Sequence, residues 1–190
     1  METTRSFLAL RLPEQAVGGA AAVLADLRRG LGDREVKWVA PALLHVTLRF
    51  FGDLDPEALG RAREWTRAQH GAWEAIPAGW RELGAFPSAR RVQVLWLGLA
   101  DETGGLRALA AEVERRLVQA GFGRGDKPFV AHVTLGRVRR GARVALPAGS
   151  ERLTSPGAAF SITQMVLMQS VLTPQGPVYT PLETAEARSR

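Results

Sequence analysis

The tetrapeptide His-Val-Thr-Leu occurs twice in this chain, at His45–Leu48 and at His132–Leu135. The two copies contain two of the three histidines in the sequence, and they lie 87 residues apart. At the same offset the apolar run Phe7–Leu12 aligns with Val94–Leu99, and each run precedes a segment whose apolar residues have helical spacing. We therefore infer an internal duplication, in which each half consists of a strand, a helix and a motif strand.

The other expected elements complete two sheets. The two helices are predicted at residues 14–29 and 105–120, ending at Gly30 and Gly121, and Asp55-Pro56 indicates the start of a third helix near 56–70. Further strands are expected at 80–86, 91–99, 160–172 and 178–182. Residues 140–156 are expected to form a surface loop, and the tail from Glu183 onward is expected to fray. Without an interdomain linker, residues 1–190 are predicted to form a single domain of two lobes.

Composition limits the class of protein. Zero cysteines exclude disulfides, thiolate metal sites and cysteine nucleophiles. No apolar run approaches the length of a membrane span, and no signal peptide is recognisable, so we expect a cytoplasmic protein with no membrane partner. The net charge of +6 comes almost wholly from arginine, since Lys37 and Lys127 are the only lysines. The charge fits a polyanionic partner such as RNA and fits a solvated basic surface equally well. We expect a monomer without an obligate protein partner.

The repeated motif suggests a particular chemistry. In a strand, alternate side chains share a face, so His45 and Thr47 point one way, as do His132 and Thr134 in the second copy. If the halves pack about a pseudo-two-fold axis, two imidazoles and two hydroxyls converge. One imidazole can then act as a base and the other as an acid near neutral pH, while the hydroxyls donate to phosphate oxygens. The motif pair thus predicts phosphodiester chemistry.

Three alternative roles for the motif pair remain open. A metal site would need further ligands, and neither motif contains an acidic residue, so we expect no metal and no other cofactor. Two core histidines satisfied by backbone hydrogen bonds would have no catalytic role. An RNA-binding module would use the arginine surface without turnover, but binding alone does not require two titratable groups at equivalent positions.

The chain resembles the 2H phosphoesterase superfamily, which is defined by paired His-x-Thr/Ser-x motifs. It is most similar to the RNA 2′,3′-cyclic phosphodiesterases, also called 2′-5′ RNA ligases, over nearly its whole length. The resemblance rests on Phe7–Leu10, His45–Gly52, Phe86-Pro87, Arg91–Leu97, Phe129–Arg137, Gln169-Ser170, Leu172, Pro174, Gly176-Pro177 and Tyr179. One departure is Ala131, because the family commonly has proline directly before the second motif histidine. That change concerns the rigidity of the loop and not the chemistry.

The resemblance implies a bilobal α+β fold of the LigT type, with two antiparallel sheets framing a central groove and helices packed outside. It implies hydrolysis of a 2′,3′-cyclic phosphate, at an RNA end or on a nucleotide, to a 2′-phosphomonoester. It also implies the related joining of RNA ends through a 2′-5′ linkage. Another small cyclic phosphate or a 2′-5′ oligonucleotide is the alternative substrate within the superfamily.

The resemblance also suggests roles for the motif residues. In the hydrolytic direction we assign His132 as the general base on water and His45 as the general acid to the departing O3′. Thr47 and Thr134 are expected to hold the phosphoryl oxygens.

Three residues near the motifs are further candidates. Arg137 is expected to contact the phosphate, because a planar guanidinium matches paired oxygens, but it shares the histidine face only if the strand twists or bulges. Phe50 is a candidate for stacking on a nucleobase, with ordinary core packing as the alternative. Arg139 is a candidate contact to the RNA backbone, with a solvated basic loop as the alternative.

Overall fold

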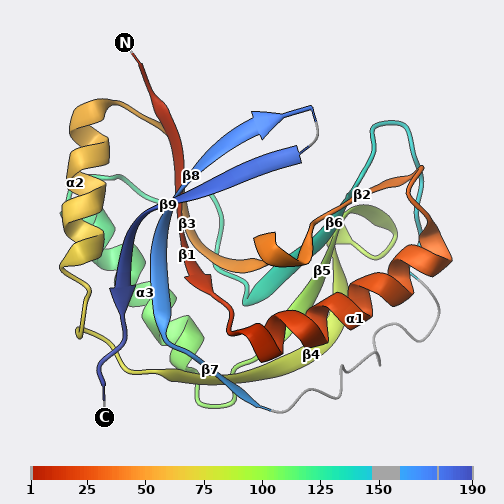
Figure 1. The fold of residues 1–190 in the computed structure, drawn as a ribbon, viewed down its shortest axis with the longest axis horizontal. Helices are drawn as coiled ribbons and strands as arrows, with labels where there is room; N and C mark the ends of the chain where they lie inside the picture. The colour runs from red at the N-terminus through yellow and green to blue at the C-terminus, as the bar shows by residue number, and fades with distance from the viewer. Residues whose placement is uncertain (1, 147–158, 175, 190) are drawn as a thin grey trace.

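A computed structural model describes residues 2–146, 159–174 and 176–189 of the chain. In chain order its strands and helices are β1 (Thr4–Arg11), α1 (Glu14–Leu31), β2 (Val36–Trp38), the 3-10 helix η1 (Pro41–Leu43), β3 (His45–Leu54), α2 (Pro56–Arg67), β4 (Ile76–Ser88), β5 (Arg91–Ala100), α3 (Gly105–Gln119), β6 (His132–Val138), β7 (Phe160–Ile162), β8 (Gln164–Thr173) and β9 (Gly176–Glu186). Three α-helices follow the strands β1, β3 and β5, and the C-terminal part of the described chain consists of strands (Figure 1).

The strands form two antiparallel wings that meet at one residue pair. The strand order is β7-β4-β5-β6-β3-β1-β8-β9, and β2 pairs with β6. One wing consists of β3, β1, β8 and β9, and the other of β7, β4, β5, β6 and β2. Between the wings, β3 and β6 pair only at Val46 and Val133, a contact we call the seam. The fold is therefore the bilobal α+β arrangement that the sequence led us to expect, with its two sheets joined at the seam.

Each half of the sequence contributes strands to the wing of the other half. In one wing, β1 of the first half pairs with β3 on one side and with β8 of the second half on the other. In the other wing, β5 of the second half pairs with β6 on one side and with β4 of the first half on the other. Helix α1 follows β1 just as α3 follows β5, as the duplication predicts. Neither half of the sequence thus forms a wing by itself.

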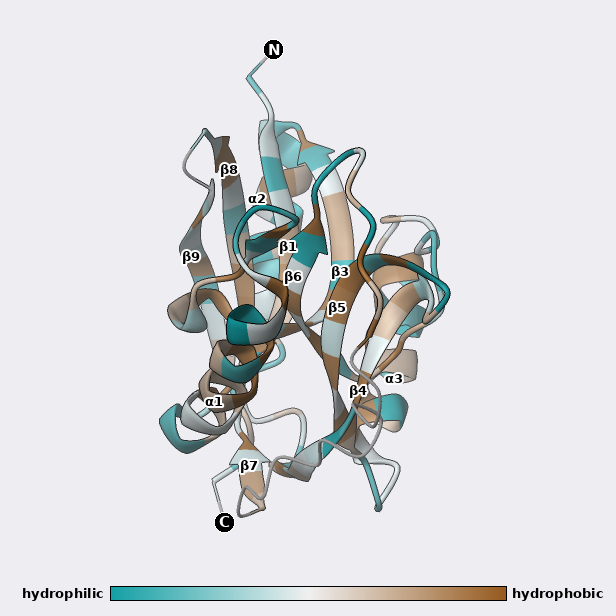
Figure 2. Ribbon diagram, turned by 90° about the vertical axis from the view of Figure 1, so that its right-hand side faces the viewer, coloured by the Kyte–Doolittle hydropathy of each residue, from teal (hydrophilic) through white to brown (hydrophobic). Residues whose placement is uncertain are grey.

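The core lies between the wings and the helices. Helix α1 buries Ala16, Ala20, Val23, Leu24 and Leu27, and α3 buries Leu106, Ala110, Val113 and Leu117, so each helix presents one apolar stripe inward. The central strands supply the rest of the core, with Leu8, Leu10, Leu95 and Leu97 fully buried. Figure 2 shows apolar residues concentrated on the central strands, and polar residues on the loops and the outer turns of the helices.

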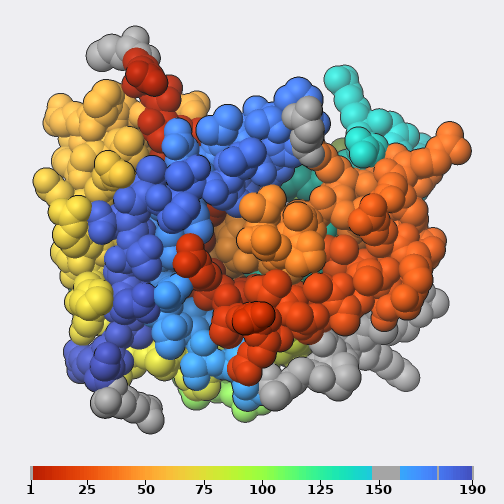
Figure 3. Space-filling view, viewed as in Figure 1, coloured from red at the N-terminus to blue at the C-terminus, as the bar shows by residue number. Residues whose placement is uncertain are grey.

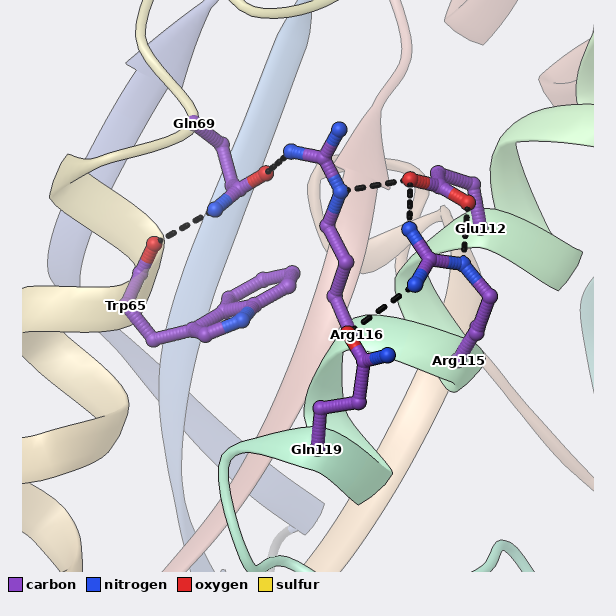
Figure 4. A network of polar contacts seen from close by, with 6 residues as sticks. All are labelled: Trp65, Gln69, Glu112, Arg115, Arg116 and Gln119. Atoms are coloured by element: carbon purple, nitrogen blue, oxygen red, sulfur yellow. Dashed lines mark hydrogen bonds and ion pairs between the residues drawn. The ribbon is translucent and has the colours of Figure 1, made fainter.

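A polar network connects the end of α2 to α3 on the outside of the molecule (Figure 4). Gln69 donates to the carbonyl of Trp65 at 2.9 Å and accepts from Arg116. Arg116 and Arg115 both bind Glu112, and together they lower the pKa of that carboxyl to about 2. None of these residues lines the groove described below.

Several boundary predictions were wrong. Helix α1 extends past Gly30 to Leu31 and is capped by Gly32, whose φ of 72° suits glycine. The apolar stretch 160–172 is divided into β7 and β8, because β7 pairs with β4 in one wing and β8 with β1 in the other.

The tail also does not fray, because β9 runs to Glu186 and the next two amides bind the carbonyls of Thr163 and Trp73. Residues 140–146 hold neither helix nor strand, as expected for the predicted loop, and 147–156 lie outside the described residues. No helix in the described ranges is long and apolar enough to cross a bilayer.

Candidate active site

The two motif histidines lie on either side of the seam. His45 begins β3 and His132 begins β6, so each directly precedes one valine of the Val46–Val133 pair. Because the strands are antiparallel, the register places His45 across from Thr134, and His132 across from Thr47. The fold therefore brings both motifs to one place, as the sequence predicts.

Both imidazoles are held in the same orientation by the backbone. Nδ1 of His45 lies 2.7 Å from the carbonyl oxygen of Leu43, and Nδ1 of His132 lies 2.7 Å from that of Val130. A carbonyl can only accept, so Nδ1 carries the hydrogen and donates it in each case. In the neutral ring Nε2 is then left without a hydrogen. Each histidine can accept a proton there, or donate one once it is charged.

Aromatic rings pack around each histidine. The ring of His45 stacks on Phe7 with centroids 4.8 Å apart and meets the edge of Tyr179 at 5.4 Å. His132 meets Phe86 at 5.0 Å and Trp96 at 5.8 Å, both edge to face. The rings restrict the movement of the imidazoles and exclude water from their sides.

Burial lowers the pKa of both imidazoles below the ordinary value of 6.5. In each case the hydrogen bond to the backbone carbonyl opposes this effect, and the charge of Arg137 adds to it. A positive charge on His132 also lowers the pKa of His45, so the two rings interact electrostatically. The pair therefore disfavours double protonation.

A groove of about 650 Å³ opens beside the histidines. In Figure 3 it lies where the β8–β9 hairpin (blue) approaches the segment from β2 to β3 (orange). Of the predicted site residues it is lined by His45, Thr47, Phe50, Thr134 and Arg137. His132 is not among the lining residues, although Thr134 of the same strand is. Arg139 lies outside the groove, where its amide donates to the carbonyl of Glu35 at 2.7 Å.

Bulges after both motifs turn two further side chains toward the groove. Between Thr134 and Gly136, β6 has one residue more than the stretch of β5 that it pairs with. Between Thr47 and Arg49, β3 likewise has one residue more than the paired stretch of β1. Each bulge reverses the alternation of side chains, so the fifth residue after each histidine, Phe50 or Arg137, lines the groove. The bulge on which the Arg137 prediction depended is present. Phe50 is 45% exposed, which excludes ordinary core packing.

The groove contains positive charge that was not predicted. Arg5 and Lys37 line it together with Arg137, and no aspartate or glutamate is among the described residues that do so. The guanidinium of Arg5 lies 4.6 Å from the centroid of Phe50. Tyr179 also lines the groove, and burial raises the pKa of its hydroxyl. Arg5 and Lys37 belong to a strand end and a three-residue strand, neither of which gives a pattern that sequence reasoning detects.

No group of three or more potential metal ligands (His, Cys, Asp or Glu) occurs in the parts of the chain that the structure describes.

Comparison with known proteins gives a consistent result. The family description "2'-5' RNA ligase superfamily" matches residues 15–173. The RNA 2′,3′-cyclic phosphodiesterase of Archaeoglobus fulgidus is 32% identical over 182 residues, covering 96% of this chain and 99% of the relative. That of Aeropyrum pernix is 36% identical over 172 residues, covering 87% and 96%. The crystal structure of TT0787 of Thermus thermophilus superposes with a TM-score of 0.80 at 29% identity, covering 98% and 99%.

Proposed function

This chain belongs to the 2′-5′ RNA ligase superfamily, and from that membership we propose that it is an RNA 2′,3′-cyclic phosphodiesterase. The relatives of similar length have that name. The observation that most directly supports the proposal is the pair of identically oriented imidazoles at the seam, each with Nε2 free to exchange a proton. A cyclic phosphodiester needs one group to activate water and another to protonate the leaving oxygen, and the pair supplies both.

In the proposed reaction His132 is the base and His45 is the acid. Nε2 of His132 takes a proton from water as the water oxygen bonds to phosphorus. The bond from phosphorus to O3′ breaks, and O3′ takes the proton from Nε2 of His45. The product is a 2′-phosphomonoester. In the related joining reaction a 5′-hydroxyl takes the place of water, the same bond to O3′ breaks, and the product is a 2′-5′ linkage. This assignment stays a prediction, because both rings have the same hydrogen bond and the same direction of pKa shift.

The side chains beside the histidines would stabilise the phosphate. Thr47 and Thr134 can donate hydroxyl hydrogens to its non-bridging oxygens, and Arg137 can donate two parallel hydrogen bonds. A bound phosphate also raises the pKa of nearby imidazoles, because its negative charge favours their protonated form. Since the two histidines disfavour being protonated together, substrate binding would protonate only one of the two rings.

The substrate we propose is an RNA or nucleotide with a 2′,3′-cyclic phosphate end. Exposed Phe50 is placed to stack on a nucleobase, and the groove charge suits the nucleic acid backbone. Arg139 remains a candidate RNA contact only for RNA that extends beyond the groove.

The proposal is tested with adenosine 2′,3′-cyclic phosphate in excess EDTA. We expect the 2′-monophosphate as the product, identified by chromatography against the 3′-isomer. The double variant His45→Ala/His132→Ala should retain its fold and lose turnover. Undiminished turnover in that variant would refute the two-histidine scheme. RNA binding that weakens with salt, without turnover in the wild type, would favour the RNA-binding module instead.

A further inference from the structure

The groove continues past the histidines to a part of the chain that the proposed reaction does not use. One edge of β6 pairs with β3 at Val133 and then with β2 from Gly136 to Val138. The row of side chains from His132 through Thr134 to Arg137 therefore ends beside β2, whose residues Lys37 and Trp38 line the same groove.

Lys37 is placed between Arg137 and the β8–β9 hairpin. It lies directly opposite Arg137 in the register of β2 and β6, so the two side chains share a face. On its other side, a Cβ added to Gly176 would lie 4.0 Å from Cε of Lys37. In the described part of the chain Lys37 forms no ion pair, and no carboxylate lines the groove there. In the proposed reaction Arg137 and the motif threonines bind the reacting phosphate, so Lys37 is a cation available to another anion.

Trp38 anchors the strand from the face opposite to Lys37. Adjacent strand residues point to opposite faces, so Lys37 shares the groove face with Arg137, and the ring of Trp38 packs on the core face against Val36 and Leu95. Nε1 of Trp38 donates to the carbonyl of Gly32 at 2.9 Å, and a Cβ added to Gly136 would lie 2.9 Å from Cε3 of the ring. These contacts hold in place the short strand from which Lys37 extends.

We propose that Lys37 marks a second nucleotide subsite, whose ligand is the nucleotide that precedes the cyclic phosphate end. Lys37 binds the phosphate that links this nucleotide to the terminal one. Phe50, on the other wing and next to Arg5, remains available for the terminal base. The subsite rests on the proposed function and narrows it, because its preferred substrate is an RNA chain of two or more nucleotides.

The experiment compares two substrates with the same end, adenosine 2′,3′-cyclic phosphate and the dinucleotide ApA with a 2′,3′-cyclic phosphate. For each protein the ratio of kcat/KM, dinucleotide over mononucleotide, is measured. Lys37→Ala should lower this ratio about tenfold, the effect of one charge-assisted hydrogen bond, and Lys37→Arg should largely restore it. Lys127→Ala is the matched control, because Lys127 is the only other lysine, is exposed and does not line the groove.

Salt provides a readout that a structural defect would not change. Each phosphate contact to a single strand contributes about 0.7 to the slope of log affinity against log salt. For the dinucleotide, Lys37→Ala should reduce the slope of log kcat/KM by about that amount, and Lys127→Ala should not.

Other results would separate the two proposals. If Lys37→Ala lowers kcat/KM equally for both substrates, Lys37 acts at the reacting phosphate and the subsite is wrong. If it lowers neither, the subsite is also wrong, while the proposed function stands. If the wild-type protein hydrolyses neither substrate, the proposed function fails and the subsite fails with it.

Discussion

Each candidate catalytic imidazole is oriented by a main-chain carbonyl two residues earlier in the chain. No side chain is needed to fix its tautomer. The sequence could predict that His45 and His132 have equivalent settings, because the tetrapeptide repeats. It could not predict the carbonyl partners or the surrounding rings, because these depend on how η1 and the two residues before His132 approach the strands.

The assignment of acid and base can be tested with a leaving group that needs no proton. In a 2′,3′-cyclic substrate with sulfur at the 3′ bridging position, the departing thiolate is stable without protonation. We expect His45→Ala to regain most of its lost rate on this substrate, and His132→Ala to remain inactive, because activation of water is still required. Rescue of His132→Ala alone would reverse the assignment.

The pH dependence follows from the directions of the pKa shifts. The base must be neutral and the acid protonated, and both pKa values lie below 6.5 in the free protein. The bell-shaped profile of kcat/KM should therefore have its maximum on the acid side of pH 6.5.

Arg137→Gln removes a positive charge that lowers the pKa of both imidazoles, so both pKa values should rise. The acidic and the basic limb of the pH profile should therefore both move to higher pH, while the activity itself falls. Arg139→Gln is the control, because the charge of Arg139 lowers neither histidine pKa. An Arg137→Gln profile that keeps the wild-type limbs would contradict the electrostatic account.

At the scale of the elements, irregularities in the strands position the site. Strand alternation correctly placed the histidines and threonines on one face. The bulges that turn Phe50 and Arg137 toward the groove were not predictable, because an inserted residue leaves the apolar pattern almost unchanged. The short strand β2 was also missed, since three residues are too few for a periodic pattern.

The strand β4 offers a matched pair of glycines to test the support of His132. A Cβ added to Gly84 would overlap the ring of Trp96, which packs against His132. A Cβ added to Gly79 would make an ordinary contact with Ala100 at 3.8 Å. Gly84→Ala should cost about 1–3 kcal/mol of stability and lower kcat, as overpacking displaces the ring. Gly79→Ala should change neither by a comparable amount, as measured by urea unfolding and turnover.

A nearly buried arginine ties the first motif strand to the segment that leads to the second motif. Arg49 forms an ion pair with Glu114 of α3 and donates to the carbonyls of Phe122 and Gly123. Glu114 also accepts from the amide of Gly125 at 2.7 Å. The side chain of Arg49 is only 7% exposed, so its loss leaves several acceptors without a partner.

Arg49→Met should therefore lower the free energy of unfolding by about 2 kcal/mol. The control is Arg29→Met, which removes an exposed ion pair with Asp26 and should cost less than about 0.5 kcal/mol. Equal midpoints in urea for the two variants would show that the Arg49 contacts contribute no more than a surface pair.

At the scale of the whole molecule, β4 and β8 are exchanged between the two halves of the sequence. Each half therefore needs the other in order to fold. A chain cut between Ala89 and Arg90, in the exposed turn that joins β4 to β5, gives one fragment from each half. We expect neither fragment alone to unfold cooperatively, because β4 and β8 would each lack the strand they pair with. A mixture of the two should regain a cooperative transition in circular dichroism. A cooperative transition in either fragment alone would contradict this view.

The duplication and the α+β fold class followed from the sequence because both halves repeat strand, helix and motif strand. The exchange of strands could not be predicted from the sequence, since β4 and β8 each pair with a strand that belongs to the other half of the sequence. The ordered C-terminal tail was missed because Ala185 and Ala187 fill the space there with small side chains that give no strand signal.

The seam also bears on how such an enzyme could diversify. A single backbone rung, Val46 against Val133, sets the separation of the two imidazoles, whereas the far end of the groove is bounded by β2 and the tip of the β8–β9 hairpin. Replacing that hairpin tip would therefore change which RNA ends are admitted without altering the spacing of acid and base. In this architecture the residues that select the substrate can change while the spacing of the two histidines stays the same. The hairpin tip is therefore the place to introduce a new substrate preference.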